Sequence, residues 1–212
     1  MAFFLTQPDE AAIQDFTQEQ RTSNLSYQPL RGTEFKFDSK DFERDDRFSS
    51  FWIDHARVKL GSGSACYEAA VQALKNWRQF EMPWVSVFPE QQELQVDLVV
   101  VIRAAHIGFW SLSGCKIVYV VDECDESGDK QRFGFAYGTT LQHLVSGEER
   151  FLVEYNLRTD EVFYDVLSFS RGGNWLVRLG SLATRYFQQQ FREQSLEAMQ
   201  KAVSSRSSIK SL

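Results

Sequence analysis

The spacing of apolar residues changes at one place in the chain, and this change constrains the fold more than any other feature. From Cys66 to Trp77, apolar residues recur at helical spacing, with Ser64 placed to cap a helix and Pro83 placed to stop it. Beyond Pro83, apolar and polar residues alternate, which is typical of half-buried strands. Segments with this alternation follow one another along the chain: 84–88, 94–103, 115–124, 131–140, 148–156 and 162–171.

Short turns connect several of these segments. Residues 125–129 and 157–161 separate neighbouring strands, and neither is long enough for the crossover that parallel strands require. An earlier segment, residues 52–60, alternates in the same way and predicts one further strand. We therefore expect an antiparallel sheet.

Helical spacing returns towards the C-terminus, where a long amphipathic helix is predicted from about Leu182 to Val203. Its apolar face is formed by residues three or four positions apart: Phe187, Phe191, Ser195, Ala198 and Ala202. Residues 204–212 have no periodicity and predict a flexible tail. The expected organisation is one domain over residues 1–203.

A sheet and a helix that each have one apolar face must bury those faces against each other. The order of elements therefore predicts an α+β fold, in which a curved antiparallel sheet wraps around the long C-terminal helix. This arrangement is called a helix-grip or START-like fold, and it leaves a lined space between sheet and helix. A calycin-like barrel with a terminal helix is the alternative.

Composition excludes several classes of function. The 212-residue chain has a formal net charge of −6 and no strongly basic stretch, so no nucleic-acid partner is expected. Its three cysteines form no CxxC pair, which argues against a disulfide framework. With no signal-peptide pattern and no membrane-spanning apolar run, the sequence predicts a soluble cytoplasmic protein.

No motif indicates a cofactor or a metal ion. Residues 60–66 match only the first two glycines of a dinucleotide-binding loop. The three histidines, His55, His106 and His143, are scattered without the spacing of metal ligands. We therefore expect neither a cofactor nor a metal site.

The densest group of polar and aromatic residues lies between Arg132 and Phe151. On a strand, Phe133, Phe135 and Tyr137 share one face, while the small residues at 134, 136 and 138 leave the other face nearly bare. A bare strand face indicates that another backbone, a helix or a ligand comes close to it.

Two charged residues in this region are predicted to face the core. Glu149 is two positions from Phe151 and Arg171 is two positions from Phe169, so each charged side chain shares a strand face with a phenylalanine. Because a buried carboxylate is costly unless it is paired, we expect Glu149 to pair with Arg171 or Arg132. Such a pair is either a structural ion pair that fixes strand register or a polar anchor inside an apolar cavity.

Other residues are candidates for a functional site because of their side-chain chemistry and their position along the chain. Tyr137 and His143 are suited to hydrogen bonding or acid–base chemistry. Trp110 and Trp175 flank loops beside the sheet and are expected either at a pocket mouth or in the core. The charged run at residues 39–47 is expected to be a solvated loop.

Several motifs are spread along nearly the whole chain. They are Tyr27, Gly32-Thr33, Val58-x-Leu-Gly-Ser-Gly63, residues 77–84, Phe133-Gly-Phe-Ala-Tyr-Gly-Thr139, Gly147-Glu-Glu-Arg-Phe151, Ser168-Phe-Ser-Arg171 and Phe191-x-x-x-Ser-x-x-Ala-Met199. Together they resemble the motifs of uncharacterised protein family 0548, a domain of unknown function found in bacteria and plants. The resemblance implies a shared fold and brings no established activity. It directs attention to His143, Glu148, Glu149 and Arg171.

The leading functional hypothesis is that the protein binds a small hydrophobic or lipid-like molecule in an apolar cavity. The expected ligand-binding residues are Tyr137, His143, Glu149, Arg171, Trp110 and Phe135. A second hypothesis is a cyclase, dehydratase or hydrolase that uses His143 or Glu149 as general base. A third is a module that docks on a membrane surface or a partner through exposed aromatic residues. The sequence leaves the oligomeric state open.

Overall fold

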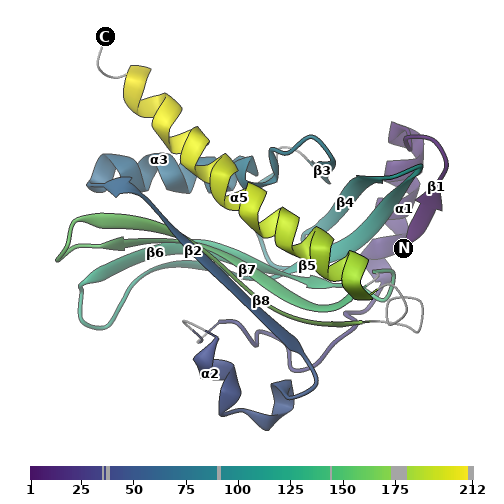
Figure 1. Cartoon of the computed structure of the whole chain (residues 1–212), viewed down its shortest axis with the longest axis horizontal. Coiled ribbons are helices and arrows are strands. Elements are labelled where there is room, and N and C mark those ends of the chain that lie inside the picture. The colour runs from purple at the N-terminus through teal and green to yellow at the C-terminus, as the bar shows by residue number, and fades with distance from the viewer. Residues whose placement is uncertain (35, 37–38, 90–91, 144, 173–180, 210–212) are drawn as a thin grey trace.

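Antiparallel strands form one open, eight-stranded sheet in the computed structural model (Figure 1). The structure describes residues 1–34, 36, 39–89, 92–143, 145–172 and 181–209. The strand order is β2-β8-β7-β6-β5-β4-β3, and β1 pairs with β5 beside this path. The strands are β1 (Ala2–Phe4), β2 (Trp52–Ser62), β3 (Val85–Phe88), β4 (Val99–His106), β5 (Phe109–Cys124), β6 (Lys130–Thr139), β7 (Val145–Asn156) and β8 (Glu161–Gly172).

The predicted helix-grip fold is confirmed. The long helix α5 (Ser181–Ile209) and α3 (Ser64–Lys75) lie on one face of the curved sheet (Figure 1). The edge strands β2 and β3 do not pair with each other among the described residues, so the alternative of a closed barrel is wrong. The remaining helices are α1 (Glu10–Thr22), α2 (Lys40–Glu43) and the short 3-10 helices η1 (Asp46–Phe48) and η2 (Arg78–Phe80).

Local details differ from the sequence prediction at the element ends. Strand β5 begins at Phe109 rather than near Cys115, because its first half pairs with both β1 and β4. Helix α3 begins at Ser64, so Gly63 with a φ of 85° is the capping residue. Helix α5 continues to Ile209, beyond the predicted end at Val203.

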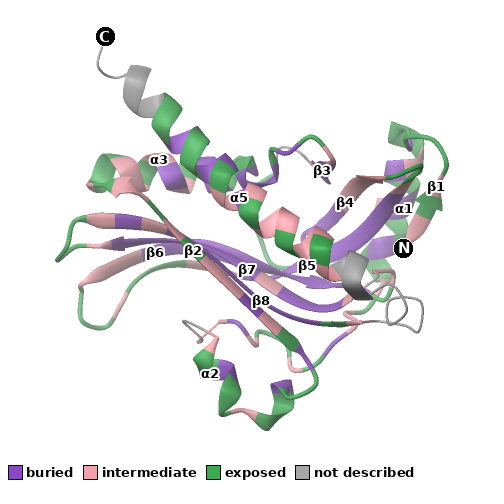
Figure 2. Cartoon of the chain, in the orientation of Figure 1, coloured by how far each residue is buried: buried purple, intermediate pink, exposed green. Residues whose placement is uncertain are grey.

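The main core lies between the inner face of the sheet and the layer formed by α3, η2 and α5. Trp77 packs edge-to-face against Phe135, with ring centroids 5.1 Å apart, and Phe80 packs against Phe151 at 5.6 Å. Helix α5 contributes Met199, which is fully buried in the same cluster. Figure 2 shows that the centres of the strands are buried.

The outer face of the sheet is covered as well. Helix α1 packs Ile13 and Phe16 on β4 and β5, and α2 and η1 pack Phe42 and Phe48 against Phe169 of β8. The prediction that residues 39–47 form a solvated loop is therefore wrong. Its phenylalanine is part of a second core on the face opposite α5.

This second core generates a stability prediction. Phe42→Ala removes a ring that is only 3% exposed and lies 4.8 Å from Phe48, so it should cost about 3 to 5 kcal/mol of unfolding free energy. Leu5→Ala, at a side chain 90% exposed, serves as the control and should change stability by less than about 0.5 kcal/mol. Urea denaturation measures both, and equal stabilities for the two variants would contradict the packing described here.

Candidate functional site

A cavity of about 360 Å³ lies between the N-terminal half of α5 and the inner face of the sheet. Strands β3 to β8 provide its floor, and α5 closes it with Phe187, Phe191 and Arg192. Most of its wall is apolar or aromatic. Other side chains on the wall include Trp84, Val85, Ile102, Ala104, His106, Phe109, Tyr137, His143, Val145, Glu149 and Ser168, together with the polar residues Ser111, Ser113, Thr139, Ser170 and Gln188.

A carboxyl–phenol pair forms the polar wall of the cavity. Tyr137 on β6 and Glu149 on β7 are register partners, so their side chains share the inner face. The Tyr137 hydroxyl donates a hydrogen bond of 2.6 Å to Oε2 of Glu149. Burial raises the pKa of Glu149 to about 7, although the Tyr137 hydrogen bond and the Arg192 charge act in the opposite direction. Glu149 therefore exchanges a proton near neutral pH.

A second polar group ties α5 to the sheet at the cavity edge. Asp54 of β2 is buried and accepts hydrogen bonds from Arg185, with Nη2 at 2.7 Å from Oδ1. Arg192, about two turns further along α5 and on the cavity wall, lies 3.2 Å from the same Oδ1. The sequence signal for this group was a charged residue within the apolar row of strand 52–60. Its arginine partners, distant in sequence, were not predicted.

The two histidines at the cavity are held by local contacts. His143, on the connection between β6 and β7, contacts the backbone of Val145 through Nδ1, and burial lowers its pKa to about 4. It is therefore neutral at pH 7. His106 at the end of β4 contacts the Ser111 hydroxyl at 2.9 Å, and burial lowers its pKa too.

Arg171 does not reach the cavity. It lies on the outer face, where its guanidinium is 4.7 Å from the ring centroid of Phe51, so the predicted pairing with Glu149 is wrong. The parity argument failed because β8 is apolar on both faces: Tyr164 and Val166 point inward, and Leu167 and Phe169 point outward. The register partner of Glu149 on β8 is Ser168.

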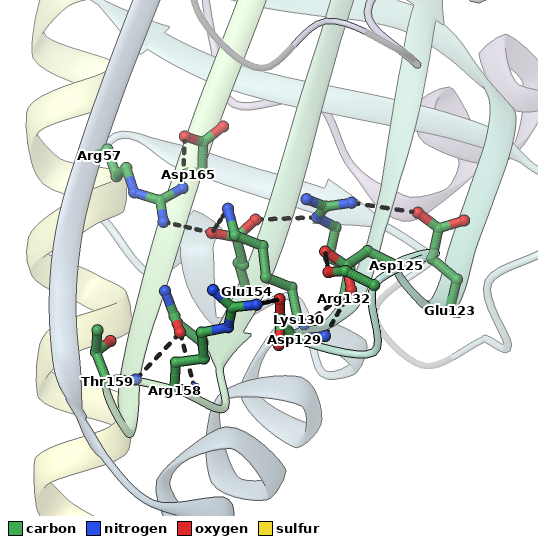
Figure 3. Close-up of polar contacts among 12 residues, drawn as sticks. Arg57, Glu123, Asp125, Asp129, Lys130, Arg132, Glu154, Arg158, Thr159 and Asp165 are labelled. Atoms are coloured by element: carbon green, nitrogen blue, oxygen red, sulfur yellow. Dashed lines mark hydrogen bonds and ion pairs between the residues drawn. The ribbon is translucent and has the colours of Figure 1, made fainter.

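The alternative pairing of Glu149 with Arg132 is also wrong. Arg132 is on the outer face and its Nε lies 2.9 Å from Glu154. Figure 3 shows Glu154 at the centre of this outer cluster, where Arg57 and Lys130 also contact it at 2.7 and 3.2 Å. These contacts link β2, β6 and β7 and lie on the face away from the cavity.

The two predicted aromatic wall residues lie elsewhere. Phe135 is fully buried against Trp77 and Phe151, next to the cavity in the packed core. Trp110 is on the outer face, beneath the guanidinium of Arg103 at 5.7 Å. Trp175 lies outside the described residues. The structure thus brings Tyr137, His143 and Glu149 together and separates them from Arg171, Trp110 and Phe135.

Glu148, the neighbour of Glu149, points to the opposite face. It accepts hydrogen bonds from the Tyr27 hydroxyl at 2.7 Å and from the backbone N–H of Thr33 at 2.9 Å. The nearby Arg150 is also buried, and its Nη2 lies 2.9 Å from Asp165. These residues attach the chain segment before β2 to the sheet.

Within the described ranges, no three His, Cys, Asp or Glu side chains are grouped closely enough to hold a metal ion. No helix in the part of the chain that the structure describes has the length and apolar character needed to cross a bilayer.

The protonation of Glu149 generates a prediction about pH. A carboxyl whose pKa is raised by folding stabilises the protein below the unfolded pKa and loses that contribution as pH rises to about 7. Glu149→Gln should therefore be more stable than the parent at about pH 9, by up to about 3 kcal/mol, with a smaller difference at about pH 4. Thermal unfolding across this range measures it. Glu197→Gln, at an exposed position on α5, is the control. A Glu149→Gln difference that is independent of pH would contradict the assignment.

Comparison with known proteins identifies relatives over the whole chain. Residues 40–198 match the family model described as a domain of unknown function, DUF1990. The UPF0548 protein of Dictyostelium discoideum is 35% identical over 98% of this chain and 99% of its own length. UPF0548 protein At2g17695 of Arabidopsis thaliana is 34% identical over 72% of this chain and 74% of its own length.

Among solved structures, the hypothetical protein jhp0584 from Helicobacter pylori is similar with a TM-score of 0.47 and 13% sequence identity, over 82% of this chain and 96% of that one. That similarity is too low to carry functional information. The sequence relatives and the family match, in contrast, extend over the strands and helices that build the cavity. The chain belongs to the UPF0548 family and contains a DUF1990 domain.

Proposed function

We propose that the protein binds a small, mainly apolar molecule in the cavity between α5 and the sheet, with a polar group of that molecule at Glu149. The observation that carries this proposal is an apolar cavity of about 360 Å³ with one carboxyl–phenol pair on its wall. Ligand pockets in proteins have this construction, with apolar walls, few polar groups and volumes of about 300 to 1,000 Å³.

The walls suit an apolar body. Trp84, Ile102, Phe187 and Phe191 line the cavity on opposite sides, so a ring system or a branched chain would contact side chains all round. Burying such a molecule is favourable by about 25 cal/mol for each Å² of apolar surface removed from water. The hydrophobic or lipid-like ligand class predicted from the sequence is consistent with this lining.

Glu149 suits a polar end group. Tyr137 occupies Oε2, and Oε1 has no hydrogen-bond partner among the described side chains and backbone. With a pKa of about 7, Glu149 donates a hydrogen bond when protonated and accepts one when ionised. Arg192, and not Arg171, is the arginine on the cavity wall, and its charge acts on this carboxyl.

A cavity-filling substitution tests the proposal. Ala104 of β4 lines the cavity, so Ala104→Trp should occupy it and reduce the binding of a fluorescent apolar probe such as 1-anilinonaphthalene-8-sulfonate by about tenfold or more. The adjacent Ala105 points to the opposite face and pairs with Trp110, which makes Ala105→Trp a matched control. Equal probe binding by both variants and the parent would refute a ligand site here.

Native mass spectrometry of gently purified protein identifies the natural ligand. A mass that is present in the native protein, absent after denaturation, and absent from Ala104→Trp would give the molecule bound in the cavity. Such a mass that persists in Ala104→Trp would place the ligand elsewhere on the protein.

An acid–base enzyme is the second candidate, and one observation favours it. Glu149 combines a pKa of about 7 with direct access to an apolar cavity, which are the properties of a general base. Incubation with the molecule identified by mass distinguishes the two functions. An enzyme converts it to a product of different mass or structure, and Glu149→Gln retains binding while losing that conversion.

A further inference from the structure

A continuous row of rings connects the cavity to the molecular surface. Phe3 of β1 packs on Phe109 of β5 at 5.7 Å, and Phe109 stacks on His106 at 4.6 Å. His106 then contacts Phe187 of α5 at 5.2 Å, and Phe187 contacts Tyr186 at 5.8 Å. Three of these residues, His106, Phe109 and Phe187, also line the cavity.

The outer ends of this row are exposed to solvent. Ile107, at the tip of the turn between β4 and β5, is 97% exposed, and Phe3 and Tyr186 are 57% and 60% exposed. We call the group the apolar rim, and it consists of Phe3, His106, Ile107, Phe109, Tyr186 and Phe187. Large apolar side chains gathered in this way on a surface indicate an interaction site.

The segments that build the rim on the sheet side have no charged side chains. Residues 1–8 and 104–115 contain no Asp, Glu, Lys or Arg, although these residue types make up 25% of the chain. On α5, Arg185 is bound to Asp54 and is thus turned towards β2. Among the side chains that the structure describes, the rim therefore offers no charge to a peptide, which favours a partner recognised by apolar contact.

The geometry points to a lipid bilayer as that partner: we propose that the apolar rim docks on a membrane surface, with Ile107 inserted among the lipids and the cavity opening towards them. A stable protein interface needs about 20 to 30 residues on each side, and the rim has six exposed or half-exposed side chains. A bilayer needs no shape complement, and aromatic rings favour its interfacial zone.

The position of the rim gives this docking a consequence for the cavity. His106, Phe109 and Phe187 belong to the apolar rim and also line the cavity. An apolar molecule that leaves a bilayer at the rim would therefore reach the cavity along these rings without crossing water. The proposal goes beyond ligand binding itself, since it rests on the exposed rings and would hold whatever the cavity contains.

Sedimentation with vesicles tests the proposal. The full-length protein should bind phosphatidylcholine vesicles, and Ile107→Asp should weaken binding by about tenfold or more, because one buried apolar side chain is lost. Ile107 is almost fully exposed, so the variant should fold normally. Leu157→Asp is the control, at an exposed leucine in the turn between β7 and β8, at the opposite end of the strands.

Several results would overturn the docking proposal. The proposal is wrong if the parent protein does not bind phosphatidylcholine vesicles, or if Ile107→Asp binds them as tightly as the parent. It is also wrong if binding requires anionic lipid and disappears in high salt. A concentration-dependent dimer that Ile107→Asp abolishes would instead assign the rim to a second copy of the chain. Ala104→Trp, which fills the cavity, should still bind vesicles. Probe binding therefore tests the ligand site, and vesicle sedimentation tests membrane docking independently of it.

Discussion

The buried carboxylate of Glu148 determines how the chain covers both faces of its sheet. The Tyr27 hydroxyl and the backbone N–H groups of Arg31 and Thr33 donate hydrogen bonds of 2.7, 2.8 and 2.9 Å to it. They hold the segment before β2 on the outer face, where it buries the second core. Since side chains alternate along a strand, an outward Glu148 requires an inward Glu149, and a slip of one residue would exchange their environments. The contact that closes the outer face thus places the cavity's carboxyl group.

The same contact explains one of the small residues on β6. A Cβ at Gly138 would lie 2.2 Å from the Tyr27 hydroxyl, so at this position the covering chain segment occupies the bare strand face predicted from the sequence. Gly147 is small for another reason, because a Cβ there would lie 2.0 Å from the carbonyl oxygen of Phe169 on the neighbouring strand β8. Motifs that are far apart in the sequence, around residues 27, 138 and 148, meet at this one place.

The sequence predicted the elements well where a single pattern determined them. Alternation and short turns specify the meander from β5 to β8, and the spacing of Phe187, Phe191 and Ser195 specifies α5. The alternation of side chains also placed Tyr137 and Glu149 on the inner face, because the large side chains of β6 from Phe133 to Tyr137 lie on one face only. It misplaced Arg171, because β8 is apolar on both faces and its alternation has no preferred side. It missed the pairing of Asp54 with Arg185, since nothing local in either segment specifies a contact between residues so far apart.

The way α5 is attached explains why the cavity exists. Its C-terminal half buries Ala198, Met199 and Ala202 in the main core, where close packing leaves no space. Its N-terminal half is held by the packing of Phe191 on Phe80 and Phe151 and by the ion pairs of Arg185 and Arg192 with Asp54. Replacing a buried ion pair by packed apolar residues is often neutral or stabilising, so stability alone does not account for this arrangement. The ion pairs reach β2 through long side chains and hold the helix at the sheet edge without filling the space beneath it. Asp54 thus positions the half of α5 that closes the cavity.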